Sequence, residues 1–253
     1  MADPVTRSVI TPERFSRGMT FEEYVRYTGS PENLAREAWG GYVADGGSMP
    51  TARKDNSAVF RERYAAARLT DEQAAAIRWL VAQPGGPAKI LMISEDWSSD
   101  CRRDVPMMAR LAEAGGLELR IFNRDGQTIL AKRRPDPAAY PDANHDLMLQ
   151  FMNDKNGGQW ASIPVAAFYT KDFAELHRYI EYPAIYHKDR IRGHQQAARS
   201  GETDAQARER AQREFLAMQG SPFFSVWASA AVDEILSALH ETLTVRMIGG
   251  RPA

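Results

Sequence analysis

The spacing of hydrophobic and polar residues predicts a helical beginning to the chain. Over residues 1–84 each apolar segment follows a suitable N-terminal cap, either a hydroxyl residue before proline or a capping box. These caps are Thr11-Pro12, Thr20–Glu23, Ser30-Pro31 and Thr70–Gln73. Residues 44–57 are rich in Gly, Pro, Asn and Asp, and we expect a loop there.

The middle of the chain alternates strand and helix patterns. KILMIS at 89–94 is a short apolar run typical of a strand buried on both faces, and a helix is expected over about 100–114. Residues 116–126 alternate apolar and polar side chains before a turn, whereas 145–154 return to helical spacing. Two strand-like runs within 163–183 predict a hairpin. The predicted order is α-β-α-β-α-β-β.

Helical patterns return after residue 183. The charged stretch 202–220 closes on Gly220, and a second helix is capped by Ser221-Pro222. That second helix contains FFSVWASAAVDEIL, which is apolar enough to need a covering surface.

Composition narrows the classes of partner. The 253 residues include 32 Lys and Arg against 33 Asp and Glu, for a formal charge of -1, so no global field attracts nucleic acid or an anionic membrane. No window reaches the roughly 18 apolar residues of a membrane span, and the N-terminus lacks the apolar run of a signal peptide. A single cysteine excludes an intrachain disulfide framework and the cysteine pairs of zinc ribbons. We expect a cytoplasmic protein without nucleic-acid or membrane partners.

No residue pattern predicts a metal or a cofactor. Nucleotide-binding glycine motifs, a P-loop and the GxSxG motif of hydrolases are absent. The histidines show no metal-ligand spacing, so we expect scattered surface or core roles for them. They are His145, His177, His187, His194 and His240.

The one cysteine lies in a segment with a distinctive pattern. Trp97 directly precedes a four-residue motif, SSDC, that ends in Cys101, and Pro106 follows five residues later. Pro164 stands further on in SIPVA. Together with the strand before the motif and the helix after it, these residues resemble the thioredoxin-like family, and EDW before the motif is similar to a bacterial branch. The resemblance covers roughly residues 70–183.

The resemblance implies an α/β fold with a thioredoxin-like core, a mixed sheet of about four strands, and helical extensions at both ends. We expect an N-terminal extension over 1–69, the core over 70–184 and C-terminal helices over 185–253, packed as one compact unit. The implied activity is thiol–disulfide exchange with protein or small-molecule thiols and disulfides. The implied site comprises the motif residues Ser98, Ser99, Asp100, Cys101 and Pro106 and the substrate-binding residues Trp97, Ile163 and Pro164, with Pro164 expected to be cis.

Ser98 departs from the family pattern, because the family has the nucleophilic cysteine there and a hydroxyl cannot replace a thiolate. The buried acid that assists the second cysteine in many thioredoxins is also missing, since its position falls near Met92. Three interpretations of Ser98 remain open. It is only a helix N-cap; it is an engineered or naturally drifted substitution that disables an enzyme; or it leaves Cys101 as a sole reactive thiol.

Charged residues around the motif allow two interpretations. Glu95, Asp96 and Asp100 are either solvated carboxylates or groups that raise a nearby thiol pKa and repel acidic clients. We expect Cys101 in the first helical turn, less exposed than Ser98 and mainly protonated at neutral pH. Arg102 and Asp104 are expected to point to solvent.

Two functions fit these observations. The first is a thiol–disulfide oxidoreductase homologue that is inactive or impaired because its nucleophile is replaced. The second is a non-catalytic binding protein that uses the groove beside Trp97 and Pro164, with a homodimer as one way to cover the apolar C-terminal helix.

Overall fold

The computed structural model describes residues 9–42, 47–131 and 134–248. The predicted N-terminal caps are confirmed: the side chains of Thr11, Thr20, Ser30 and Thr70 each accept a backbone N–H at the start of a helix. The elements of this part are α1 (Pro12–Ser16), α2 (Phe21–Thr28), α3 (Pro31–Leu34), β1 (Glu37–Tyr42), β2 (Ser48–Ala52), α4 (Ser57–Ala66) and α5 (Asp71–Val81).

A four-stranded mixed sheet forms the centre, as the sequence predicts. Its order is β4-β3-β7-β8, with β3 parallel to β4 and antiparallel to β7, and with β7 and β8 joined as the expected hairpin. Because β3 and β4 are parallel, a crossover must connect them, and the helix after the cysteine motif is that crossover. The elements are β3 (Lys89–Ser94), α6 (Ser99–Gly115), β4 (Glu118–Asn123), β7 (Val165–Tyr169) and β8 (Glu175–Ile180).

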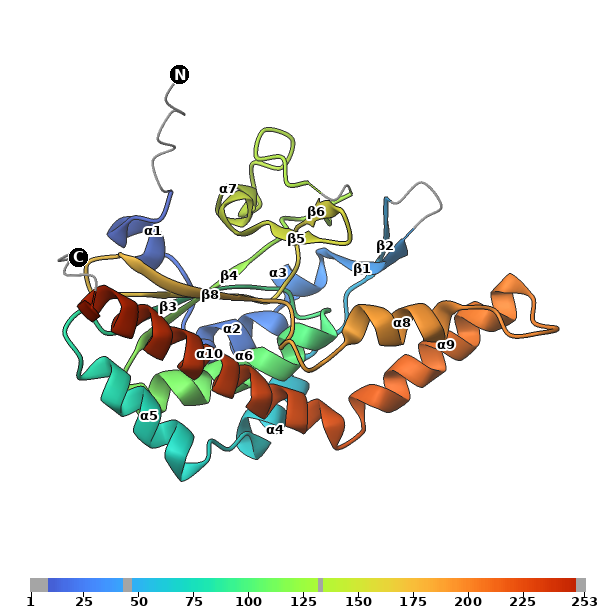
Figure 1. Ribbon diagram of the computed structural model, residues 1–253. Helices are drawn as coiled ribbons and strands as arrows, with labels where there is room; N and C mark the ends of the chain where they lie inside the picture. Colours follow the sequence, from blue (N-terminus) through green and yellow to red (C-terminus); the bar gives the residue numbers. More distant parts are fainter. Residues whose placement is uncertain (1–8, 43–46, 132–133, 249–253) are drawn as a thin grey trace, which may run out of the picture.

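Helices α4, α5, α6 and α10 (Phe223–Ile248) lie on one face of this sheet (Figure 1). The other face carries α7 (His145–Met148) and the small hairpin of β5 (Asn153–Lys155) and β6 (Gly158–Trp160). Strand β3 supplies much of the core, since Ile90, Leu91, Met92 and Ile93 are fully buried. The structure therefore has the layered α/β architecture expected of a thioredoxin-like core.

Two segments differ from the prediction. The expected loop over 44–57 contains β2, which pairs with β1 as an antiparallel hairpin, while residues 43–46 lie outside the described part. The strand pattern is hidden there because β2 is largely exposed and carries no apolar face. The expected helix over 145–154 is shorter: α7 passes into a 3-10 turn at Leu149–Phe151 and then into β5.

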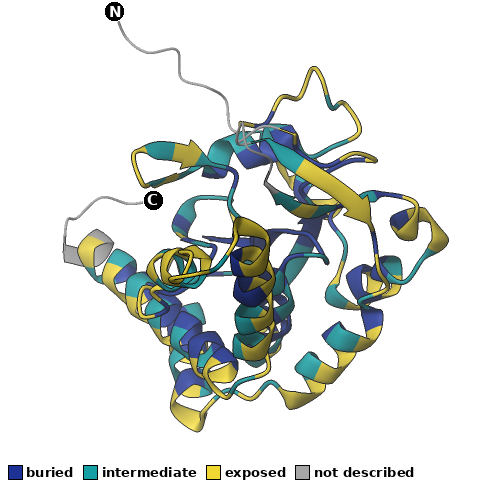
Figure 2. Ribbon diagram, turned by 90° about the vertical axis from the view of Figure 1, so that its right-hand side faces the viewer, coloured by how far each residue is buried: buried dark blue, intermediate teal, exposed yellow. Residues whose placement is uncertain are grey.

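The C-terminal extension has a packed part and a projecting part. Helix α10 packs on α5, α6 and β8, so most of its apolar face is covered by the chain itself. Helices α8 (Lys188–Gln196) and α9 (Asp204–Gln219) pair with each other and extend away from the sheet (Figure 1). Figure 2 shows the contrast between the buried centre and the more exposed outer helices.

Among residues 9–42, 47–131 and 134–248, no helix combines the length and the apolar character that crossing a bilayer requires.

Candidate functional site

The cysteine motif lies at the carboxyl end of β3, where the chain turns into α6. Ser98 is the N-cap of α6, and its side-chain oxygen accepts a hydrogen bond from the backbone N–H of Cys101 at 3.4 Å. Capping by a hydroxyl satisfies a backbone donor that the helix leaves unpaired. The N-cap interpretation of Ser98 therefore describes what its side chain does in the fold.

Cys101 lies in the first turn of α6, as predicted, and is less exposed than Ser98. Its exposed fraction is 0%, against 8% for Ser98. Burial raises the pKa of the Cys101 thiol to about 12, although hydrogen bonds from Ser94, Ser98 and the Glu95 backbone oppose the rise. At neutral pH the sulfur is a buried thiol, and the interpretation of Cys101 as a freely reactive monothiol loses its support.

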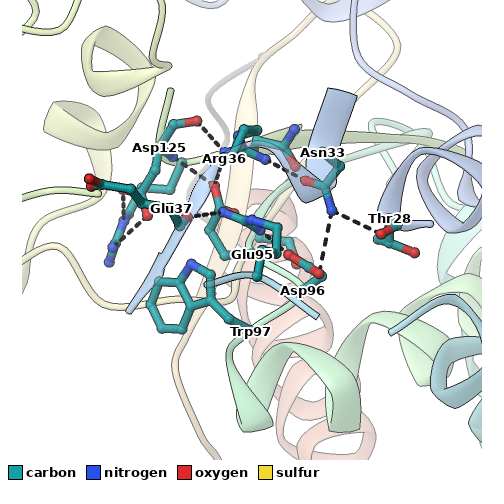
Figure 3. Close-up of polar contacts among 12 residues, drawn as sticks. Thr28, Asn33, Arg36, Glu37, Glu95, Asp96, Trp97 and Asp125 are labelled. Atoms are coloured by element: carbon teal, nitrogen blue, oxygen red, sulfur yellow. Dashed lines mark hydrogen bonds and ion pairs between the residues drawn. The ribbon is translucent and has the colours of Figure 1, made fainter. Parts of the chain in front are cut away.

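An ion cluster holds the loop before the motif, and we call its members Arg36, Arg53, Glu95 and Asp96 the N-terminal ion cluster. Glu95 accepts from Arg36 at 2.8 Å and from Arg53 at 2.9 Å, and Arg53 also contacts Asp96. Figure 3 shows the Glu95 carboxylate beside Arg36 and the Asp96 carboxylate on the side of Asn33, with the Trp97 ring turned away from both. All four charged side chains are almost fully buried.

The backbone adds to this cluster. The N–H of Asp125 donates to the Glu95 carboxylate at 2.8 Å, and Arg36 donates to the carbonyl oxygens of Asp125 and Gly126. Burial raises the pKa of Glu95, with the two arginines opposing the rise. These contacts tie the motif loop to the segment between α3 and β1, to Arg53 directly after β2 and to the turn after β4.

A second ion cluster lies on the other side of the motif, and we call its members Asp100, Arg103, Glu181 and Lys188 the C-terminal ion cluster. Arg103 donates to Asp100 at 2.8 Å, one helical turn away, and Lys188 of α8 contacts both Asp100 and Glu181. Burial raises the pKa of Glu181, but the charges of Lys188 and Lys155 together lower it by more. The resulting pKa of Glu181 is about 2.

These clusters correct the predictions that the acids are solvated or repel acidic clients, whereas the predicted effect on the thiol holds for Asp100, whose charge raises the pKa of Cys101. Glu95, Asp96 and Asp100 are buried and paired, so they are neither solvated carboxylates nor an uncompensated negative patch facing clients. Asp104 was also expected in solvent and is instead fully buried, where it accepts from Arg103 and from the Tyr179 hydroxyl. A buried carboxylate needs such partners because its desolvation is costly.

Arg102 was expected to point to solvent, and the structure shows it only partly exposed. Its side chain is half-buried and donates to the carbonyl oxygens of Asp96 and Trp97 at 3.0 and 2.9 Å. It therefore supports the backbone of the motif loop.

The residues expected to bind substrate lie around this motif. The Ile163-Pro164 peptide bond is cis, as predicted, and the pairing of Ile93 with Val165 places Pro164 at the same edge of the sheet as the motif. Ile163 and Pro164 are buried, whereas Trp97 is half-buried. Of the remaining motif residues, Ser99 is half-buried and Pro106 is buried inside α6.

Trp97 has neighbours that the sequence did not predict. The ring of Trp39, from β1, lies 5.8 Å from the Trp97 ring, and the Arg124 guanidinium lies 5.2 Å from it. The N-terminal hairpin of β1 and β2 thus reaches the motif, although it lies outside the expected core.

Sequence reasoning also missed the cations of both clusters. Arg36, Arg53 and Lys188 stand 59, 42 and 88 residues from the acids they contact. A doublet of acids after a buried strand signals that cations are needed, but nothing in the spacing identifies which of the 32 Lys and Arg residues supply them.

In the part of the chain that the structure describes, no group of three His, Cys, Asp or Glu side chains is arranged to hold a metal ion.

Comparison with known proteins supports a thioredoxin-like family. A family model described as thioredoxin matches residues 47–139, a range that runs from β2 through the motif and β4. No curated protein matches the chain.

Two solved structures are similar over most of the chain. One is a protein of unknown function from Pseudomonas aeruginosa, with 15% identity and a TM-score of 0.46 over 90% of this chain and 95% of that one. The other is an HIV epitope-scaffold, with 14% identity and a TM-score of 0.47 over 90% of this chain and 96% of that one. Neither likeness indicates an activity.

Proposed function

We propose that this protein is a homologue of thioredoxin-type thiol–disulfide oxidoreductases whose redox site is disabled by serine at position 98. One observation carries the proposal: the N-cap of α6, where the family has its nucleophilic thiol, is a serine, and the only cysteine is fully buried behind it. The match of residues 47–139 to a thioredoxin family model supports the relationship.

The chemistry follows from the two side chains. Disulfide exchange begins when a thiolate attacks one sulfur of the client disulfide. The Ser98 hydroxyl cannot make that attack, and Cys101 is held as a thiol away from solvent. The unaltered protein is therefore inactive or strongly impaired toward protein and small-molecule disulfides, while the helix, the cis-proline and the Trp97 surface of the site persist.

Restoring the thiol tests this proposal. We expect Ser98→Cys to reduce the disulfides of insulin in the presence of dithiothreitol, and the unaltered chain to remain at background. Ser99→Cys is the matched control, because it adds a half-buried thiol one residue further on, away from the nucleophile position. Equal inactivity of the three proteins would reject a disabled redox site.

A non-catalytic binding protein is the second candidate, and exposed apolar side chains favour it. Phe223 and Val226 at the start of α10 are 62% and 50% exposed, and Val245 near its end is 62% exposed. A homodimer that covers them is the partner we propose under this candidate. If the protein sediments as a monomer at all concentrations, and if Phe223→Ser leaves its sedimentation unchanged, the homodimer loses its support.

A further inference from the structure

An open cavity of about 600 Å³ lies between α1 and the loop that leads into α7 (Figure 1). The described residues that line it all lie outside the cysteine motif. Sites that bind small molecules usually have volumes of roughly 300 to 1,000 Å³. The cavity therefore has the size of a ligand site, and it is independent of the redox proposal.

Two cations and two acids line this cavity. Arg14 donates from Nη2 to Asp146 at 3.0 Å and to Asn144 at 2.7 Å, so the charges of Arg14 and Asp146 already compensate each other. Arg17 and Asp142 are exposed, and neither contacts an oppositely charged side chain within the described ranges. The cavity thus presents one free positive charge and one free negative charge.

The Asp142 carboxylate is held in place at one of its oxygens. Its Oδ2 atom accepts the backbone N–H of Gln127 at 2.6 Å. Gly126 makes room for it, because a Cβ atom at residue 126 would lie 2.2 Å from the same oxygen. In the part of the chain that the structure describes, the other oxygen, Oδ1, accepts no hydrogen bond. One oxygen therefore fixes the group, and the other is free for a ligand.

The loop wall of the cavity is joined to its surroundings. Asn144 donates from Nδ2 to the carbonyl oxygen of Asn123 at 2.6 Å, and its Oδ1 accepts from Arg14. This one side chain connects the loop to the end of β4 and to α1. Pro137 and Pro141 restrict the backbone of the same wall. A wall ordered before binding lowers the entropy cost of holding a ligand.

Arg14 has donors that its partners leave unused. Its guanidinium lies 5.4 Å from the Phe122 ring, and its buried Nε has no hydrogen-bond partner among the described residues. A buried donor without a partner is costly, and such donors are often completed by water, an ion or a ligand. Arg17 follows Arg14 by three residues, which places both on one side of α1. An anion bound at Arg17 therefore has a second guanidinium beside it.

We propose that this cavity binds a short peptide of about two or three residues through its free termini. The peptide carboxylate lies at Arg17, beside Arg14, and the ammonium group lies at the free oxygen of Asp142. A zwitterion meets both free charges, whereas a simple anion or cation leaves one of them without a partner. A single amino acid would leave most of the volume empty, and Pro141 supplies apolar surface for the residues between the termini.

Titration with triglycine at pH 6.5, where both peptide termini are charged, tests this proposal. Shifts of the Arg17 and Gln127 backbone amides in ¹H–¹⁵N spectra report binding at the two free charges. We expect saturable shifts and an affinity about fivefold higher than for N-acetyl-triglycine, which lacks the ammonium group, or for triglycinamide, which lacks the carboxylate. Absence of saturable shifts, or equal affinity for the three peptides, would overturn the proposal.

Single substitutions assign each peptide terminus to its residue. Asp142→Asn keeps an oxygen for the Gln127 N–H but removes the charge, so the preference over N-acetyl-triglycine should disappear while the preference over triglycinamide stays. Arg17→Met should have the reverse effect. Gly126→Ala should act as Asp142→Asn does, because the added Cβ displaces the carboxylate. If Asp142→Asn and Arg17→Met reduce both preferences alike, or change neither, these residues do not bind the termini.

Arg78→Met and Glu241→Gln are the matched controls. Both residues are exposed, and they belong to α5 and α10 on the other face of the sheet from α7 (Figure 1). We expect both variants to keep the two fivefold preferences. If they altered the preferences as much as Arg17→Met and Asp142→Asn, the peptides would respond only to the overall charge of the protein, and the cavity would not be their site.

Discussion

Two buried glutamates, one in each ion cluster, meet the same number of cations and respond in opposite ways. Glu95 contacts Arg36 and Arg53, yet burial raises its pKa. Glu181 contacts Lys155 and Lys188, and its pKa falls to about 2 because the two lysines outweigh its burial. Glu95 has no exposed surface and lies beside Asp96 and Asp125, whereas Glu181 is 7% exposed.

The difference teaches what each cluster contributes. Ion pairs deep in a protein offset a large desolvation cost, and removing one partner leaves a buried charge without compensation. The N-terminal ion cluster therefore keeps the motif loop in place at little net gain in stability. The C-terminal ion cluster, being nearer to solvent, adds stability and attaches α8 to the helix that carries the motif.

The largest effect is expected from Arg53→Met. This change leaves Glu95 with one cation and removes the cation of Asp96, so the free energy of unfolding should fall by roughly 3 to 5 kcal/mol. Urea denaturation followed by circular dichroism measures the change. Arg178→Met is the control, because Arg178 and Glu175 form a partly exposed pair that is worth at most about 1 kcal/mol. Similar losses in the two variants would contradict the buried role of Arg53.

Glu181→Gln sharpens the comparison through pH. The folded pKa of Glu181 is about 2 and its unfolded value about 4.5, so its contribution is complete above pH 4.5 and disappears as pH falls toward 2. We expect this variant to be less stable than the unaltered chain by up to about 3 kcal/mol at pH 7, with the gap closing in acid.

Glu95→Gln is the matched comparison for that experiment. Burial raises the folded pKa of Glu95 above its unfolded value, so the unaltered chain should gain stability relative to this variant as pH falls through that range. Urea titrations at pH 7 and pH 3.5 measure both trends. Parallel trends in the two variants would erase the distinction between the clusters.

Lys188→Met should lower the free energy of unfolding by less than Arg53→Met or Glu181→Gln. Asp100 keeps Arg103 and Glu181 keeps Lys155, so about 2 kcal/mol of stability is expected to be lost. Thermal unfolding checks this value, with the exposed Lys171→Met as control. A loss as large as that of Arg53→Met would mean that the two clusters are equivalent after all.

Ser98→Ala should have the smallest effect. It removes the N-cap of α6 and leaves the Cys101 N–H without its acceptor, at a cost of about 1 kcal/mol. Ser99→Ala, which removes a hydroxyl that caps nothing in this helix, should cost less. If Ser98→Ala destabilised the protein as much as Arg53→Met, the cap rather than the ion clusters would hold the motif.

Local interactions made much of the fold predictable from the sequence. The caps at Thr20 and Thr70 bond to residues three positions away, and the apolar run Lys89–Ser94 is typical of the central strand that β3 forms. Each of these patterns lies within a few residues, so a short window contains all of its physical cause. The motif helix, the β7–β8 hairpin and the cis bond before Pro164 were predictable for the same reason or through the family resemblance.

The sequence by itself determined the helix caps, the buried strands and the order of the thioredoxin-like core, together with a motif that holds one thiol where two are expected. Only the tertiary structure decided that Glu95 and Asp104 are buried, which cations pair with the acids, and that Trp39 of the N-terminal extension reaches the motif. The physical reason is the distance along the sequence between the residues that interact. Desolvation and ion pairing depend on what surrounds a side chain in space, and the cations Arg53 and Lys188 lie 42 and 88 residues along the chain from Glu95 and Asp100.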